Sequence, residues 1–295
     1  MVESTGRYWV RLHRDVVKVS GPEAETFLQG QLSQDLSLLD RSGSVWSWLL
    51  APTGKVDALL RVSRTGDGSL VIDTDAGWGE AVLARLVRFK LRTRADLELV
   101  AASVVGLRGQ GSDPDGQGWE REALGAGAAV VATPPWPGLA GADLIYLEGS
   151  EEPFRAPDGV AEMDAADYEA VRIASGQPRM GAELTERTIP GETGLVPFTV
   201  SFTKGCYTGQ ELVARIDSRG GNVARHLRRL FLSAPAEPGS ELYDGDRPAG
   251  TVTSVAPAGV SRWIALGYVR RGIEPPCRLA AGVGGPSVEV EAISW

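Results

Sequence analysis

The sequence contains few of the residues that build metal centres and nucleophilic triads. Among its 295 residues are two histidines, His13 and His226, and two cysteines, Cys206 and Cys277. This scarcity excludes a histidine-rich metal centre, and a His-based triad would have to use one of the two histidines. The cysteines match no zinc-ligand spacing, and in a reducing cytosol we expect no disulfide between them.

Membrane segments and nucleotide-binding motifs are also missing. No stretch approaches the roughly 20 apolar residues of a membrane span, and the N-terminus has no apolar region of a secretory signal. We therefore expect a cytoplasmic protein. Gly54-Lys55 lacks the earlier glycine and the following Ser or Thr of a P-loop, and no glycine-rich loop has a strand-helix context. These absences exclude nucleotide hydrolysis and NAD binding.

The composition indicates a folded chain with a net negative charge. Hydrophobic residues make up 43% of the chain and charged residues 23%, which excludes intrinsic disorder. The formal charge of −8 argues against a nucleic-acid coat held by overall positive charge. At roughly 100–200 residues per domain, the length predicts more than one domain.

Hydrophobic spacing predicts an α+β protein. Strands are expected at 9–21, at 45–64 as two strands around a turn, at 69–75 and, as one strand, at 97–107. Helices are expected over 81–90, over 164–176 with Asp164 as the cap, and just after Lys204-Gly205-Cys206. After Arg229, short strands separated by Gly/Pro turns predict an all-β terminal domain, most simply a small barrel.

The segment 203–221, TKGCYTGQELVARIDSRGG, contains the chain's clearest chemical motif. It places the thiol of Cys206 and the cation of Lys204 at a predicted helix N-terminus, where backbone N–H groups and the helix dipole lower a thiol pKa. Cys206 is therefore a candidate functional thiol, with Lys204 as its neighbour. The alternative is a buried cysteine that packs as a small hydrophobic residue.

The residues 204–211, KGCYTGQE, resemble the signature of the YgfZ family of folate-binding proteins. Four further segments agree with this family in the same order: FLQGQLSQDL (27–36), APTGKVDALL (51–60), RIASGQPRMGAELTERTIPGETGLV (172–196) and GTVTSVAP with WIALGYVRR (250–271). The resemblance covers most of the chain.

The family is related to the glycine-cleavage T-protein, an aminomethyltransferase. The resemblance implies an α+β, three-domain ring with tetrahydrofolate in its central opening and a C-terminal β-barrel. It divides the chain into a folate-binding region, 1–222, and a barrel domain, 223–295. Within 1–222 it implies two interleaved subdomains, 1–45 with 155–222, and 46–154.

The resemblance also implies folate-binding residues. Glu192 corresponds to the acid that contacts the pterin ring, where a carboxylate can accept two parallel N–H donors. Arg219 falls where related proteins place an arginine facing the folate. The plainer alternatives are an exposed turn carboxylate for Glu192 and one more cation of an Arg-rich stretch for Arg219.

The sequence departs from the related proteins in two places. Thr203 stands where the signature often has Asp, which removes a charge partner for Lys204 but leaves the thiol. The catalytic aspartate of the T-protein has no clean counterpart, because Asp73, Asp75 and Glu80 are all candidates near the expected position. Aminomethyl transfer therefore stays open.

Two locally basic segments, 85–94 and 204–229, offer contacts for an anion. In the first, Arg85, Arg88, Arg92 and Arg94 could attract a folate glutamate tail, tRNA or an acidic partner, and the alternative is a solvated helix face.

Family members are linked to iron–sulfur cluster assembly or repair and to tRNA-thiolating enzymes that need such clusters. The resemblance therefore implies a tetrahydrofolate-binding protein with iron–sulfur enzymes or assembly factors as partners and no metal of its own. The alternatives are a folate-dependent aminomethyl or one-carbon transferase, which would make the chain an enzyme, and a non-catalytic docking module for tRNA or a modifying enzyme.

Overall fold

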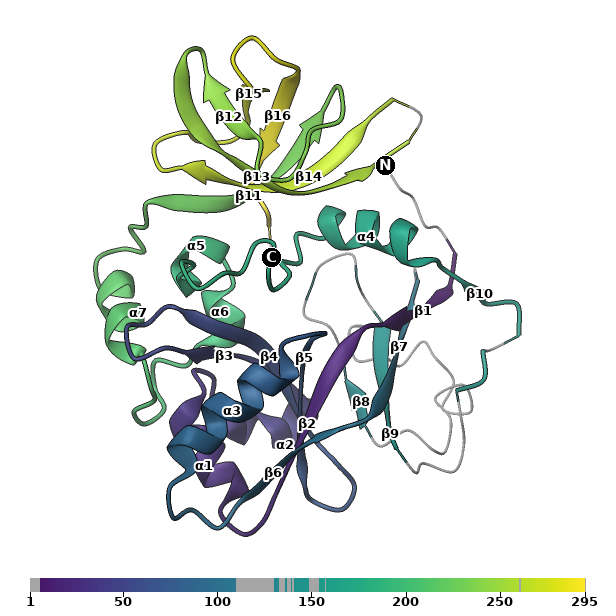
Figure 1. The fold of residues 1–295 in the computed structure, drawn as a ribbon, viewed down its shortest axis with the longest axis vertical. Helices are drawn as coiled ribbons and strands as arrows, with labels where there is room; N and C mark the ends of the chain where they lie inside the picture. Colours follow the sequence, from purple (N-terminus) through teal and green to yellow (C-terminus); the bar gives the residue numbers. More distant parts are fainter. Residues whose placement is uncertain are drawn as a thin grey trace.

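The computed structural model describes residues 6–109, 130–132, 136, 139, 141–148, 154–156, 158–259 and 261–294. Within these ranges the chain forms two five-stranded sheets and a closed six-stranded barrel (Figure 1). Helix α4 (Ala165–Ala174) lies between the barrel and the strands below it, and it contacts both. In the described part of the chain, no helix is long and apolar enough to cross a membrane.

One antiparallel sheet, the β2 sheet, carries the largest hydrophobic core. Its strand order is β3 (Ser44–Leu50), β4 (Val56–Arg64), β5 (Leu70–Asp75), β2 (Arg14–Ser20) and β6 (Asp96–Val100). The helical elements that accompany it are α1 (Ala24–Gln31), η1 (Leu36–Leu38), α2 (Leu39–Ser42) and α3 (Gly79–Lys90). The antiparallel neighbours β3, β4 and β5 confirm the strands predicted over 45–75, and α3 confirms the helix predicted over 81–90.

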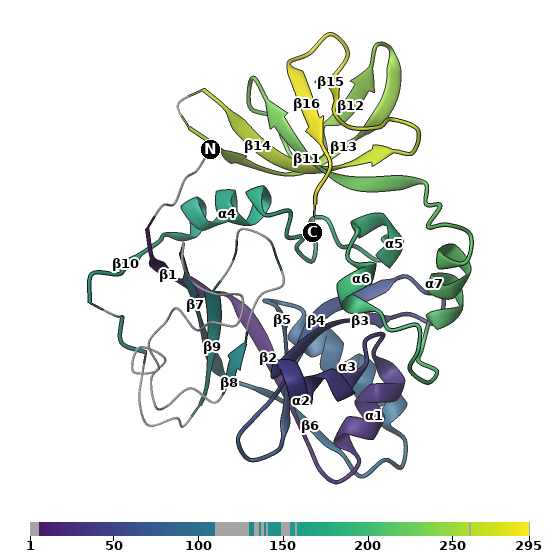
Figure 2. The same ribbon diagram turned by 180° about the vertical axis from the view of Figure 1, so that it is seen from behind.

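The second sheet, the β1 sheet, stands beside the first (Figure 2). Its strand order is β10 (Ala161–Glu162), β1 (Tyr8–Leu12), β7 (Ala102–Arg108), β9 (Gly141–Leu147) and β8 (Val130–Ala132). All of its pairings are antiparallel except that of β1 with β10.

The single strand predicted at 97–107 is wrong. The chain leaves the β2 sheet at Val100 and enters the β1 sheet at Ala102, so this stretch forms both β6 and β7. The β1–β2 segment makes the same crossing at His13. Neither crossing contains a Gly or Pro, and strands of both sheets carry β-branched residues, so the sequence pattern shows no break.

The barrel confirms the predicted all-β C-terminal fold. Its strands are β11 (Arg225–Leu232), β12 (Glu241–Asp244), β13 (Arg247–Pro257), β14 (Trp263–Arg270), β15 (Cys277–Ala281) and β16 (Ser287–Glu291). The short helices α5 (Pro190–Thr193), α6 (Val196–Thr199) and α7 (Gln210–Asp217) precede it. The division at residues 222 and 223, and the two subdomains before it, stay predictions.

A buried carboxylate attaches the barrel to the rest of the molecule. Glu183 is 1% exposed, and it accepts hydrogen bonds from Thr253 Oγ1 at 2.7 Å and Ser254 Oγ at 2.6 Å, both on β13. Its other oxygen lies 3.3 Å from Nη1 of Arg172 on α4. Asp164 caps α4 as predicted, accepting from the Asp167 N–H at 2.8 Å. These contacts place α4 against the barrel.

A chain of alternating arginines and aspartates joins the two sheets. This Arg–Asp network runs through Arg14, Asp73, Arg61, Asp143 and Arg108. Arg61 on β4 reaches Asp73 of its own sheet at 2.8 Å and Asp143 of the β1 sheet at 2.6 Å. Burial alone would raise the pKa of Asp143, but the charges of Arg108 and Arg61 outweigh it and lower that pKa. Asp143 is therefore ionised although it is buried.

We expect Arg61→Met to lower the free energy of unfolding by about 3 kcal/mol, because breaking a buried ion pair leaves charge without its partner. The loss should stay near that value, since Asp73 keeps Arg14 and Asp143 keeps Arg108. The matched control is Arg64→Met on the same strand, whose side chain is 32% exposed and pairs with Glu25 and Asp40. It should cost less than about 1 kcal/mol. Equal losses in urea denaturation would contradict this account of the network.

Candidate functional site

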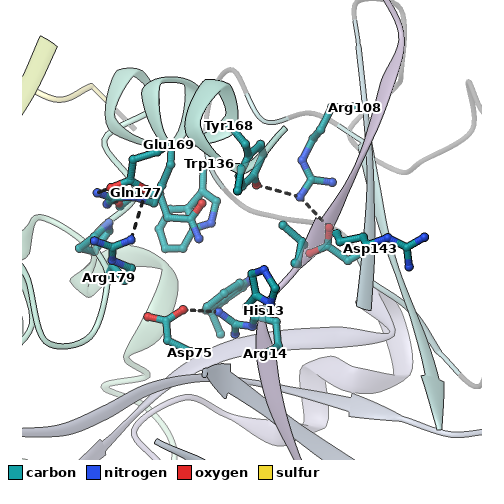
Figure 3. Close-up of a pocket in the computed structure, with 16 residues that line it drawn as sticks. His13, Arg14, Asp75, Arg108, Trp136, Asp143, Tyr168, Glu169, Gln177 and Arg179 are labelled. Atoms are coloured by element: carbon teal, nitrogen blue, oxygen red, sulfur yellow. Dashed lines mark hydrogen bonds and ion pairs between the residues drawn. The ribbon is translucent and has the colours of Figure 1, made fainter. Parts of the chain in front are cut away.

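A polar cleft of about 180 Å³ opens where the two sheets and α4 meet (Figure 3). His13 and Arg14 lie at the crossing from β1 to β2, and Tyr168 projects from α4 on the opposite side. The cleft is lined by Arg11, Leu12, His13, Arg14, Trp46, Asp75, Arg108, Trp136, Asp143, Ala165, Tyr168, Glu169, Arg172, Gln177, Pro178 and Arg179. The Arg–Asp network forms one wall, because Arg108 Nη2 reaches both Asp143 at 2.6 Å and the Tyr168 hydroxyl at 3.4 Å.

The charges that line the cleft largely compensate one another. On α4, Arg172 makes two hydrogen bonds of 2.8 Å to Glu169, and Arg179 approaches the same carboxylate at 3.4 Å. Burial would raise the pKa of Glu169, but the hydrogen bond and charge of Arg172, with the charge of Arg179, lower it. Across the cleft, Arg14 Nη1 binds Asp75 at 2.7 Å. A ligand therefore meets paired charges rather than an open cluster of cations.

Three residues that line the cleft each keep a buried polar atom without a hydrogen-bond partner in the described part of the chain. Trp46 Nε1 and Arg108 Nε are donors, and Gln177 Oε1 is an acceptor. Trp46 is 7% exposed, and the Trp136 ring meets its ring edge-on at 5.0 Å. Buried polar atoms are normally paired, so unpaired ones beside a cleft mark places where a ligand or water can bind. The lining combines hydrogen-bonding side chains with the rings of Trp46 and Trp136, and such a lining suits a polar aromatic ligand.

Only one of the three carboxylates considered as catalytic candidates lines this cleft. Asp73 is fully buried between Arg14 and Arg61, and Glu80 is exposed at the start of α3. Asp75 lines the cleft, but Oδ1 accepts from Arg14 at 2.7 Å and Oδ2 from the Met180 N–H at 2.8 Å. Its two oxygens are thus already engaged.

Glu192 and Arg219 are not among the residues that line the cleft. Glu192 lies in α5 with its side chain 8% exposed, and Oε2 is 3.1 Å from Arg225 Nη2 at the start of the barrel. It is therefore not the exposed turn carboxylate of the plainer alternative. Arg219 is exposed in the turn after α7. Their contacts with folate stay predictions.

A second cavity, of about 240 Å³, lies next to these two residues along the chain. It is formed by α5, α6 and α7 and is lined by Ile189, Pro190, Gly191, Gly194, Val196, Pro197, Leu212, Val213, Ile216, Asp217 and Gly221. Gly191 and Gly221 neighbour Glu192 and Arg219, yet Asp217 is the one charged residue in the lining. This cavity is mainly apolar, and it suits a polar ring less well than the cleft does.

Cys206 is exposed, and it precedes a helix by more than the sequence suggested. The helix predicted just after Cys206 begins at Gln210, because Gly209 adopts a left-handed turn with φ of 81° and serves as the N-cap. The amine of Lys204 does not donate to the Cys206 thiol. Its Nζ donates to three backbone carbonyls, those of Gln29, Leu32 and Gln34. Burial lowers the pKa of Lys204 to about 8.

In the predicted basic segment 85–94, two of the four arginines are already paired with acids and two are not paired with a described acid. Arg85 binds Asp57 at 3.1 Å, donates to the Leu50 carbonyl at 3.1 Å and stacks 3.8 Å from the Phe89 ring. Arg94 pairs with Glu23 at 3.3 Å. Arg88 and Arg92 are exposed and pair with no acid among the described residues. Two of the four arginines are thus free for an anion.

Sequence reasoning missed the residues that build the cleft, although the chain carried a signal for some of them. Arg61 in LLRVS and Asp143 in GADLIYL are charges that stand directly among apolar residues of a strand. A charge buried in such a strand needs an ionic partner, so two such positions predict a buried pair. Trp46 carried no comparable signal, and Gln177 was marked only by its place in the segment 172–196, which agrees with the family.

Comparisons with known proteins place the chain among recognisable relatives. The tRNA-modifying protein YgfZ of Edwardsiella ictaluri is 32% identical over 257 residues, which cover 80% of this chain and 76% of that protein. The mitochondrial iron-sulfur cluster assembly factor IBA57 homolog of Neurospora crassa is 28% identical over 220 residues, or 70% of this chain. The match spans about half of the Neurospora protein, 49% of its length. No family model matches.

A solved structure supports the fold. The glycine cleavage system aminomethyltransferase T from Bartonella henselae superposes with a TM-score of 0.78 over 97% of this chain and 85% of that one, at 20% identity. At that identity the likeness shows the fold alone. Together with the closed barrel, it confirms the predicted α+β fold of the aminomethyltransferase type.

Proposed function

Because the chain belongs to the YgfZ family, we propose that it binds tetrahydrofolate or a one-carbon derivative and supports iron–sulfur cluster assembly or repair and iron–sulfur-dependent tRNA modification. The names of the relatives, an iron-sulfur cluster assembly factor and a tRNA-modifying protein, support the cluster and tRNA parts of this proposal. The cleft supports the folate part. A cytoplasmic location, with iron–sulfur enzymes or assembly factors as partners, belongs to the same proposal.

The observation that carries the folate proposal is the set of unpaired polar atoms beside the cleft. These atoms are buried under the cleft surface, so a ligand reaches them only when their side chains turn toward it. A pterin edge offers N–H donors that would then suit Gln177 Oε1, and ring nitrogen and oxygen acceptors that would suit Trp46 Nε1 and Arg108 Nε. Tetrahydrofolate would supply a carrier of one-carbon units. The pterin would lie against the polar wall of the cleft. There it would give hydrogen-bond partners to buried polar atoms, each of which costs free energy while it has none.

Glu192 and Arg219 remain the rival placement for the pterin, as the resemblance implies. In that placement the Glu192 carboxylate would share its charge between the ligand and Arg225. The two placements differ in which residues a ligand touches, so single variants can separate them.

We expect Gln177→Met to weaken tetrahydrofolate binding by about three- to tenfold in anaerobic calorimetric titration, the range for one neutral hydrogen bond. Glu192→Gln keeps the shape of its side chain but loses the charge. It should leave binding unchanged if the pterin lies in the cleft, and weaken it by about tenfold or more if Glu192 contacts the ring. Unchanged affinity for Gln177→Met together with a large loss of affinity for Glu192→Gln would show that the pterin binds at Glu192 and not in the cleft.

Cys206 is the proposed functional thiol. It is exposed, as a thiol that reacts with a partner must be, and it is not among the residues that line the cleft. Lys204, the other residue proposed from the motif, is engaged with backbone carbonyls. The thiol would therefore act on a partner at the surface.

In cells that lack their own family member, Cys206→Ser should fold but fail to restore an iron–sulfur-dependent tRNA thiolation, measured as thiolated nucleoside by mass spectrometry. Cys277→Ser is the matched control and should restore it, because Cys277 lies in barrel strand β15 and is partly buried. Full restoration by Cys206→Ser would reduce this cysteine to a structural part of its motif.

The transferase alternative is less well supported by the cleft. A folate-dependent aminomethyl or one-carbon transfer needs a carboxylate that can exchange a proton near the reacting nitrogen. Asp75 is the one predicted candidate that lines the cleft, and both of its oxygens already accept hydrogen bonds. The observation favours a binding role for the folate over that enzyme activity.

The docking alternative rests on Arg88 and Arg92, the members of the proposed tRNA contact with Arg85 and Arg94 that are exposed and form no ion pair with the residues that the structure describes. Reversing both to Glu should weaken tRNA binding and lower the slope of log affinity against log salt by about two. The control Arg278→Glu changes an arginine that is 77% exposed on the barrel, and it should leave the slope unchanged. If the slope of log affinity against log salt is the same for all variants, the arginines form a solvated helix face. If tRNA affinity is the same with and without folate, a docking module is favoured.

A further inference from the structure

The amine of Lys204 is fully engaged with the backbone at the end of helix α1. Its Nζ lies 2.6 Å from the carbonyl oxygen of Gln29, 2.7 Å from that of Leu32 and 3.0 Å from that of Gln34. An ammonium group has three N–H donors, and here each has one acceptor. No donor is left for a thiolate at Cys206. Lys204 instead satisfies carbonyls that a helix terminus leaves without intrahelical partners.

Three further hydrogen bonds join residues 198–201 to Ser33 and Gln34, which follow α1. Gln34 Nε2 donates to the Phe198 carbonyl at 2.9 Å, Ser33 Oγ donates to the Thr199 carbonyl at 2.6 Å, and the Ser201 N–H donates to the Ser33 carbonyl at 3.0 Å. Ser33 Oγ also accepts from the Trp48 N–H in β3 at 2.9 Å. The stretch before Cys206 is therefore attached to α1 and to the β2 sheet.

The stretch after Cys206 is held by a close backbone approach. A Cβ on Gly209 would lie 2.5 Å from the Ala51 carbonyl oxygen and 2.8 Å from Leu50 Cβ. A Cβ on Gly54 would lie 2.4 Å from Leu212 Cβ, at the first turn of α7. Both glycines have left-handed φ values, 81° and 78°. The turn at 51–54 thus packs directly on the start of α7, and side chains are excluded there.

Three segments that are far apart in the sequence, 27–36, 51–60 and 204–211, consequently meet around one exposed thiol. Figure 1 shows the connection from α6 to α7 returning beside α1. Lys204 fixes this connection two residues before Cys206, and Gly209 fixes it three residues after. Between the two anchors the thiol is exposed.

We propose that Lys204 is a positioning residue, which holds the Cys206 loop against the end of α1, and that it is not a charge or proton-transfer partner of the thiol. The inference rests on the proposed function only in treating Cys206 as functional. The attachment of the loop can be measured on the purified protein, whatever the thiol does in cells.

The test uses Lys204→Met in the full chain, which removes the three donors but keeps an unbranched side chain. Hydrogen exchange should speed up at least about tenfold at the backbone amides of Ser201, of position 204 and of Tyr207. The reason is that the loop can open locally once the Lys204 amine no longer holds it. The pH midpoint of Cys206 alkylation by iodoacetamide should stay where it is in the wild type. Lys204→Arg, which retains donors, should restore much of the protection.

Lys55→Met is the matched control, since Lys55 is an exposed lysine just after the turn at 51–54. It should change neither exchange nor alkylation. Cys277, whose pKa is raised by burial, serves as an internal reference for the reagent. An upward shift of the Cys206 midpoint in Lys204→Met, with unchanged exchange in the loop, would overturn the proposal and make the lysine an electrostatic partner.

If Lys204→Met does not fold, Gln34→Met provides the second variant. It removes the hydrogen bond to the Phe198 carbonyl and the one that Gln34 Oε1 accepts from the Asp35 N–H, and it leaves Lys204 in place. Faster exchange over 198–204 with an unchanged thiol midpoint supports the proposal, and unchanged exchange contradicts it. Failure of the proposed function would appear elsewhere, as full restoration of tRNA thiolation by Cys206→Ser.

Discussion

Arg61 connects the two sheets, and the position of the polar cleft depends on that connection. Its guanidinium binds Asp73 on one side and Asp143 on the other, and both acids bind a second arginine. Removing such charges from water is costly, so the network is stable only with its full set of hydrogen bonds. Because the partners come from β2, β4, β5, β7 and β9, the ionic geometry sets how the sheets meet. Part of this network, Arg14, Asp143 and Arg108, forms one wall of the cleft.

The polar cleft and the thiol depend on different parts of the molecule. The cleft lies among the two sheets and α4, whereas the loop of Cys206 is attached to α1, β3 and the turn at 51–54. No residue of the 204–211 motif lines the cleft. A motif can therefore identify a family through residues that hold a loop, whereas the cleft is lined by residues from other parts of the chain. Lys204 illustrates this, since its amine serves the backbone.

Much of the fold could be predicted from the chain itself. Alternation predicted the meander at 45–75, apolar spacing predicted α3 and α4, and the turn-rich C-terminus predicted the barrel, because these are local patterns. The stretch 97–107 could not be resolved in this way. Its residues suit a strand throughout, and only pairing with two different partners, β2 and β1, divides it at Ala101. The site was predicted less well, because Gln177 and Trp46 acquire their importance from neighbours distant in sequence.

The sequence by itself determined the family, the fold class and the presence of an unusual Lys-Gly-Cys motif, since these depend on residue order and local spacing. Tertiary structure alone decided which charges pair and which polar atoms stay unpaired. It placed Glu192 against Arg225, removed Lys204 from the thiol and brought Asp143 to Arg61. The physical reason is that ion pairs and buried hydrogen bonds act over a few ångströms in space, and those short distances are set by the packing of strands and helices that lie far apart along the chain.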